Sequence, residues 1–481
     1  TVDHVYVASP NTVLNLRAGI TRFVQDRFAL AAQDVDLRSL GFSNLALSQF
    51  TANTLPQINI TNYSSPVEPT GFLISTPLWS FQPTLTRNVS GHSLRMGYDF
   101  RVYQENRQDQ AFQAGVFNFT NDWTRQNDQN PSLSVEHLQG QALAALLLGQ
   151  PTGGNLPILA SRAATAKYHG MFFQDDWKVT RRLTLNLGFR YDYQSQAVER
   201  NDGATNFDPT CALPNGLLGC TVFAGVNGQP RNWRKEDYGN LGPRVGFAFD
   251  VRGNARTILR GGYGILYPSQ MWRENYPNAN GFAQTSTTYP QSDPNQPAFR
   301  LRQGFPSAPI PPQGRALGAA AFLGQNVAYD ETNGNIPRIQ QFTMSVQQQL
   351  RSNWLFEISY AGNFGRGLTA GSYDLNQLDP QFLSLGQALQ QQVPNPNAGR
   401  VPGALGAATI SREQSLRPFP HYNAITVRNP RLGSYNSHLI LFSAEKRMSQ
   451  GLAFLFSYTG GKIISDSIAT PGATRALTEV T

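Results

Sequence analysis

The sequence predicts an all-β protein, an antiparallel transmembrane β-barrel with short periplasmic turns and long extracellular loops. Three patterns support this: segments of about ten residues alternate apolar with polar side chains, neighbouring segments are joined by tiny turns, and the pairs are separated by very long connections. The composition agrees, because charged residues make up only 15% of the 481 residues and aromatic residues 11%. A typical soluble domain has roughly 25% charged residues.

The alternation is clearest in Arg182–Gln194 (RLTLNLGFRYDYQ), where one face is apolar or aromatic and the other carries Arg190 and Asp192. An all-apolar face suits lipid, and a charged face suits a wet or filled interior. The lipid-facing candidates are Leu183, Leu185, Leu187, Phe189, Phe247 and Phe249. The lumen-facing candidates are Arg17, Arg95, Asp99, Arg190, Asp192, Arg244 and Asp250. For these charges we favour interstrand salt bridges and contacts to a plug over a charged substrate path.

The strands are predicted in six hairpins, which gives roughly twelve long strands. The predicted turns are Ser9–Asn11, Ser90–His92, Thr180–Arg181, Arg252–Asn254, Arg351–Asn353 and Ser449–Gly451. The long connections cover about Val24–Thr76, Glu105–Thr165, Ala197–Tyr238, Pro268–Gly334 and Phe364–Arg431. Compact soluble domains rarely have connections of this length. Short helices are expected within them at Leu138–Leu148 and Gly314–Leu323.

Strand length offers a check on the membrane interpretation. Leu183 and Tyr193 are ten residues apart, or about 33 Å along a strand, which spans roughly 25 Å of membrane normal at a tilt of ~40°. The predicted interfacial aromatic residues are Trp177, Tyr191, Tyr193, Tyr267 and Trp354. The strands of a soluble β-sandwich or propeller also alternate apolar and polar residues. Such a fold would expose its polar face, and it would not explain why short turns alternate with very long loops.

The chemistry of the remaining motifs points away from catalysis. Cys211 and Cys220 lie close together in a loop-like segment (CALPNGLLGC), where a disulfide is favoured over two free thiols. The six histidines are well separated, and no metal-ligand or nucleophile motif is present. Lys and Arg exceed Asp and Glu by 39 to 31 without forming a basic block, which disfavours a nucleic-acid partner. We therefore expect no enzyme activity, metal or cofactor.

Several segments, in order, resemble the barrel of TonB-dependent outer-membrane receptors, in particular the Oar-like type of acidobacteria. They are Phe172–Gln194 (FFQDDWKVTRRLTLNLGFRYDYQ), Asn240–Tyr267, Ile336–Leu368, Asp374–Pro380, Arg417–Pro420 and Ala444–Ser467. The resemblance implies a barrel of about 22 strands closed by a plug. It also implies active uptake energised by the TonB–ExbB–ExbD complex. No TonB box, plug or carboxypeptidase-regulatory-like domain is recognised, so residues 1–481 are expected to be a barrel fragment.

The expected function is therefore uptake, in the outer membrane, of a large nutrient such as an oligosaccharide, a peptide or a metal chelate. A passive porin-like channel and a surface adhesion or structural barrel remain alternatives. The expected partners are outer-membrane lipid, the plug of the same protein, TonB–ExbB–ExbD and an unknown extracellular substrate. The loop residues predicted to contact it are Trp233, Tyr238, Trp272 and Tyr276.

Overall fold

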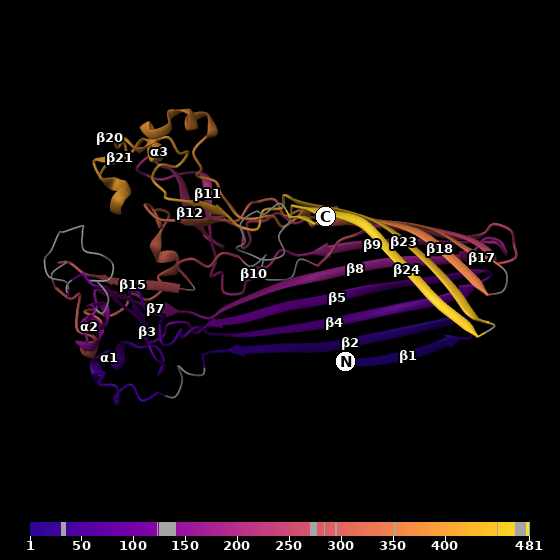
Figure 1. Ribbon diagram of the computed structural model, residues 1–481, viewed down its shortest axis with the longest axis horizontal. Coiled ribbons are helices and arrows are strands. Elements are labelled where there is room, and N and C mark those ends of the chain that lie inside the picture. The colour runs from indigo at the N-terminus through magenta and orange to yellow at the C-terminus, as the bar shows by residue number, and fades with distance from the viewer. Residues whose placement is uncertain are drawn as a thin grey trace.

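The computed structural model describes residues 1–29, 35–122, 124, 141–269, 277–282, 284–293, 296–350, 353–449, 451–466 and 478–480. Twelve long strands run side by side in one curved antiparallel sheet, and the long connections gather beyond one end of it (Figure 1). Within these residues no helix is long and apolar enough to cross a membrane.

The sheet follows the order of the chain, so consecutive long strands pair with each other. The long strands are β1 (Val2–Ser9), β2 (Thr12–Arg27), β4 (Phe72–Val89), β5 (His92–Asp109), β8 (Arg162–Lys178), β9 (Leu183–Gln194), β13 (Leu241–Asp250), β14 (Thr257–Leu266), β17 (Arg338–Leu350), β18 (Trp354–Leu368), β23 (Gly433–Ser449) and β24 (Leu452–Ser465). The short strands β10 (Val198–Glu199) and β25 (Thr478–Val480) pair with β8 and β24. Among the described residues β1 and β25 do not pair with each other, so the sheet is open. The six predicted hairpins and the twelve strands are confirmed.

The register divides the sheet into two faces of opposite character. Directly opposed residues share a face, and Asp99, Gly170 and Asp192 are opposed on what we call the polar face. Leu187 and Val245 are opposed on the apolar face. On the polar face Asp192 is only 3% exposed, whereas Val245 on the apolar face is 52% exposed. Buried carboxylates behind exposed large apolar side chains reverse the usual arrangement of a water-soluble protein.

Three connections fold into a first loop body with its own core. Its elements are α1 (Asn44–Gln49), β3 (Gln57–Ile60), β6 (Val116–Phe119), α2 (Gln141–Leu147), β7 (Gly153–Leu159), β15 (Gln284–Pro290) and the 3-10 helix η4 (Leu301–Gln303). The sheet order is β15-β7-β6-β3. Phe117 is fully buried and stacks on Phe305 with ring centroids 4.8 Å apart. The predicted helix at Leu138–Leu148 is present over Gln141–Leu147, and residues 138–140 lie outside the described part.

A second loop body is built from three connections, of which one, between β14 and β17, also contributes to the first. Its elements are β11 (Thr205–Ala212), β12 (Leu218–Phe223), η5 (Gly314–Leu317), β16 (Val327–Tyr329), β19 (Tyr373–Asp374), η6 (Pro380–Gln390), β20 (Gln392–Pro394), η7 (Gly403–Gly406), β21 (Thr409–Ser411), α3 (Arg412–Ser415) and β22 (Ile425–Val427). Its core surrounds Phe207 and Tyr422. The predicted disulfide between Cys211 and Cys220 is present, with Cα atoms 5.7 Å apart. The helix predicted at Gly314–Leu323 ends at Leu317, because Gly318 adopts a positive φ of 71°.

Candidate functional site

A network of charged side chains, which we call the wall network, lies on the polar face of β5, β8 and β9. It consists of Asp99, Arg101, Tyr168, Arg190 and Asp192. Arg190 donates from Nε to Asp192 Oδ1 at 2.8 Å and lies 3.6 Å from Asp99 Oδ2. Arg101 holds Asp99 through two bonds of 2.9 and 2.8 Å. Tyr168 donates to Asp192 and accepts from Arg190, so two arginines and two aspartates form one neutral unit.

One glycine, Gly170, makes room for this network. Gly170 lies between Asp99 and Asp192 in the register. A Cβ atom there would come within 2.6 Å of both the Arg190 guanidinium and the Tyr168 hydroxyl. A side chain at Gly170 would therefore push the network apart.

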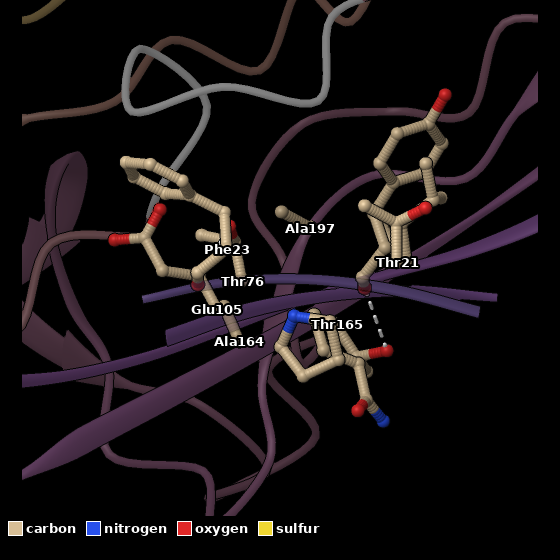
Figure 2. Close-up of a pocket in the computed structure, with 12 residues that line it drawn as sticks. Thr21, Phe23, Thr76, Glu105, Ala164, Thr165 and Ala197 are labelled. Atoms are coloured by element: carbon tan, nitrogen blue, oxygen red, sulfur yellow. Dashed lines mark hydrogen bonds between the residues drawn. The ribbon is translucent and has the colours of Figure 1, made fainter. Parts of the chain in front are cut away.

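An apolar pocket, the wall pocket, lies on the same face next to the network and closer to the loop bodies. Its volume is about 190 Å³, and it is lined by Thr21, Phe23, Thr76, Pro77, Leu78, Tyr103, Gln104, Glu105, Ala164, Thr165, Ala166 and Ala197. Figure 2 shows Phe23, Glu105 and Ala197 on the same side of the strands. The Tyr103 hydroxyl accepts a bond of 3.3 Å from Arg101, so pocket and network touch. A pocket of this size can hold one aromatic ring or a short alkyl group.

A family model described as an outer membrane beta barrel domain matches residues 1–479. The chain belongs to this family. A search of curated proteins finds no match. This family places the chain in the outer membrane, where lipid can cover the exposed apolar face.

Solved structures of outer-membrane proteins are similar to this β-barrel domain. The outer membrane transporter YddB from Escherichia coli has 10% identity and a TM-score of 0.40, over 96% of this chain and 47% of that chain. The ferric yersiniabactin uptake receptor FyuA from Yersinia pestis has 7% identity and a TM-score of 0.37, over 96% and 41%. The ferric-catecholate import receptor Fiu from K12 E. coli has 9% identity and a TM-score of 0.38, over 98% and 48%. The chain thus spans less than half of each of these structures.

The other predicted lumen-facing charges of the barrel domain lie apart from the network. Arg17 pairs with Asp3 at 2.6 Å, and both side chains are well exposed. Arg95 lies over the Phe172 ring at 5.9 Å. Arg244 lies in a shallow depression of about 420 Å³ that includes Gly188, Gly246, Gly262 and Gly264. Three of the seven predicted residues, Asp99, Arg190 and Asp192, therefore meet in one unit.

Asp250 has a local structural role, whereas the alternation of apolar and polar residues along its strand predicted a lumen-facing charge. It lies at the end of β13, where its carboxylate accepts backbone N–H bonds from Arg252, Gly253 and Ala255 at 3.3, 2.9 and 2.7 Å. Aspartate commonly bonds the backbone of a following turn in this way. Asp250 thus fixes the turn between β13 and β14.

Arg101 and Tyr168 were not among the predicted lumen-facing residues. Strand periodicity places Arg101 on the same face as Asp99, but it gives no reason to single Arg101 out. Tyr168 has a weaker signal, because it follows the alanine-rich segment Arg162–Lys167 (RAATAK), in which apolar and polar residues do not alternate.

The predicted loop contacts have different surroundings. Trp233 is only 6% exposed and packs against Ala204 and Ala224, so it stabilises the loops. Tyr238 is 64% exposed, and its ring stacks on Tyr193 at 5.3 Å. Trp272 and Tyr276 lie outside the described residues. Tyr238 therefore lies against the loop-side end of the apolar face, and its contact with a ligand stays a prediction.

Aromatic side chains lie at both ends of the apolar face, as predicted for interfacial residues. Near the short turns, Trp177 stacks on His92 at 5.1 Å, and Trp354 packs against Phe356 and Phe454. Near the loops, Tyr191 and Tyr193 end β9, and Tyr267 donates to the Leu241 carbonyl at 3.3 Å. The predicted lipid-facing residues Leu187 and Phe189 are 37% and 46% exposed between these ends. Leu183, Leu185, Phe247 and Phe249 are of intermediate exposure.

Two titratable side chains of the long connections are buried, which disfavours their charged forms. Burial lowers the pKa of His421, the nearby charge of Arg400 lowers it further, and a bond from Nε2 to the Leu218 carbonyl at 2.7 Å opposes both effects. Burial also lowers the pKa of Arg234, which is 6% exposed. In the described part of the chain, no three His, Cys, Asp or Glu residues come together as a group that could hold a metal ion.

Proposed function

We propose that this chain forms part of the wall of a TonB-dependent outer-membrane receptor that takes up a large nutrient. The observation that supports this most directly is the buried wall network beside an apolar pocket, on the face opposite the exposed apolar side chains. In this proposal the apolar face contacts lipid and the polar face lines the transport path. A site made of paired charges and an apolar pocket supports a proposed role in transport.

Each part of the site has a separate role in this proposal. The wall network is neutral and internally paired, so it holds the strands in register and presents no net charge to a passing substrate. The wall pocket accepts a small apolar group of a larger substrate. Tyr103 can donate its hydroxyl proton to a polar atom of the substrate next to that group, because the hydroxyl oxygen already accepts from Arg101.

The glycine-lined depression around Arg244 fits a plug of the same protein. Gly188, Gly246, Gly262 and Gly264 leave the backbone uncovered there, so another chain segment can approach closely. Arg244 can then donate to a backbone carbonyl or a carboxylate of that segment. A barrel filled in this way needs energy to open.

The test uses the full-length protein in planar lipid bilayers and in cells. We expect little conductance without added force, specific binding of the purified periplasmic domain of TonB, and loss of nutrient uptake in cells that lack TonB. Steady conductance with no TonB binding would instead establish a passive channel. Surface adhesion that is lost on deletion, with unchanged uptake, would establish a display role.

The pocket is tested by filling it. Ala166→Leu adds bulk to the pocket wall, where Ala166 is 4% exposed. We expect cells with this variant to grow more slowly on a nutrient that they cannot use when the gene for the full-length protein is deleted. Ala248→Leu adds the same bulk to the polar face of β13, outside the pocket, and should not slow growth. Equal growth of both variants would exclude the pocket from the transport path.

A further inference from the structure

Five exposed basic residues mark one level of the apolar face. They are Arg22 on β2, Lys167 on β8, Arg338 on β17, Arg366 on β18 and Lys462 on β24. The register places them on this face, since Lys167 is opposed to Val102 and Lys462 to His438. We call them the basic girdle.

The girdle lies at a constant distance from the short turns. Each residue is 10 to 12 positions from the turn-side end of its strand, namely Thr12, Lys178, Leu350, Trp354 and Leu452. This corresponds to about 33–40 Å along a strand, or roughly 25–30 Å of membrane normal at a tilt of ~40°. The girdle therefore lies at the loop-side boundary of an apolar band.

The band below the girdle is free of formal charge. Between four and nine positions from the same turn-side ends, the apolar face of the described long strands carries no Lys, Arg, Asp or Glu. A lysine or arginine facing lipid costs about 2–4 kcal/mol at mid-membrane and little near the interface. The abrupt appearance of basic residues at one level is what a lipid headgroup boundary requires.

The basic girdle differs from the polar face in how its charges are paired. In the described part of the chain none of the girdle residues has an Asp or Glu within ion-pair distance, whereas Arg101, Arg107 and Arg190 on the polar face are all paired. At the level of the girdle, the apolar face of the described long strands also has no acidic residue.

Arg338 and Arg366 form the centre of the girdle. They are directly opposed in the register, and like charges in that position destabilise a sheet. The Arg366 guanidinium donates to Asn436 Oδ1 at 2.8 Å and to backbone carbonyls, none of which neutralises it. An anion lying between the two guanidinium groups would remove the repulsion and accept several of their hydrogen bonds.

We propose that the basic girdle binds the phosphate groups of lipids in the loop-side leaflet of the outer membrane, with Arg338, Arg366 and Lys462 as its strongest site. The ligand is a phosphorylated lipid because the cations border an apolar band: its chains cover the band while its phosphates meet the girdle. This does not depend on the transport proposal, since it rests on the lipid-facing surface alone.

The test titrates the full-length protein in detergent with lipid A, followed by native mass spectrometry. The variant R338Q/R366Q/K462Q should lower the apparent affinity roughly a hundredfold, at about fivefold per basic residue. The matched control, R181Q/R252Q/R256Q, removes the same charge from exposed positions at the opposite, turn-side end. It should change the affinity less than about threefold.

Three outcomes would overturn the proposal. The first is an unchanged affinity for lipid A in the girdle variant while its heat-resistant migration shows that it is folded. The second is an equal loss in the turn-side control. The third is competition by inorganic phosphate as effective as that by lipid A, which would identify a site for free phosphate. Phosphatidylcholine serves as the zwitterionic probe and should bind wild type and variant alike.

Discussion

The disulfide of the second loop body allows a quantitative test of how independent the loops are from the sheet. Cys211 and Cys220 are 9 positions apart and join β11 to β12. For a closed loop of about ten residues, the chain-entropy relation gives about 2.7 kcal/mol of stabilisation at 25 °C. The double variant Cys211→Ala/Cys220→Ala should therefore lower the free energy of opening this body by about that amount.

Hydrogen exchange of the full-length protein measures this opening directly. We expect amides paired between β11 and β12 to exchange about a hundredfold faster in the variant. Peptides from β8 and β9 should keep their wild-type rates, because the wall network stabilises them separately. Wild-type protein treated with a reductant is the matched control and should behave like the variant. Unchanged exchange in β11 and β12, or equally faster exchange in β8 and β9, would refute the reasoning.

Three further predictions concern the wall network and His421. Arg190→Gln leaves Asp192 buried without its cation and should destabilise the full-length barrel in urea by about 3–5 kcal/mol, whereas Arg17→Gln, which breaks a well-exposed pair, should cost under about 1 kcal/mol. Gly170→Ala, whose Cβ meets Arg190 at 2.6 Å, should cost about 1–3 kcal/mol in the same assay, while Gly262→Ala, whose nearest atom is at 3.5 Å, should be almost neutral. Because the folded pKa of His421 is lowered, the unfolded second loop body binds the proton more readily. Resistance of this body to limited proteolysis should thus fall as the pH drops below about 6.5, and His421→Gln should abolish that dependence.

The sheet could be predicted because its signals are local. Period-two alternation and short turns fix both the strands and their hairpin partners, and long connections identify the opposite end of the sheet. The same periodicity placed Asp99, Arg190 and Asp192 on one face. Their meeting in one network depends on the register between β5, β8 and β9, which no single strand specifies.

The wall pocket shows what periodicity cannot supply. It depends on the small volume of Ala164 and Ala166 among larger lining residues such as Phe23 and Tyr103. An alanine-rich segment has no clear alternation, so the sequence does not reveal on which face its side chains lie. The network residue Tyr168 was not predicted for the same reason, since it directly follows this segment.

The two loop bodies could not be predicted from the sequence, because their contacts join connections that are far apart in the chain. β7 pairs with β15, which lies in the connection between β14 and β17, and that same connection supplies β16 to the second body. One segment thus contributes a strand to each body. A movement that separates the two bodies must bend this segment or break the pairing of β7 with β15, and strand pairing of this kind opens cooperatively. Opening the loops above the wall pocket therefore costs less free energy when the two bodies move together. Hydrogen exchange of the amides in β15 and β16 should thus change in parallel when a substrate binds.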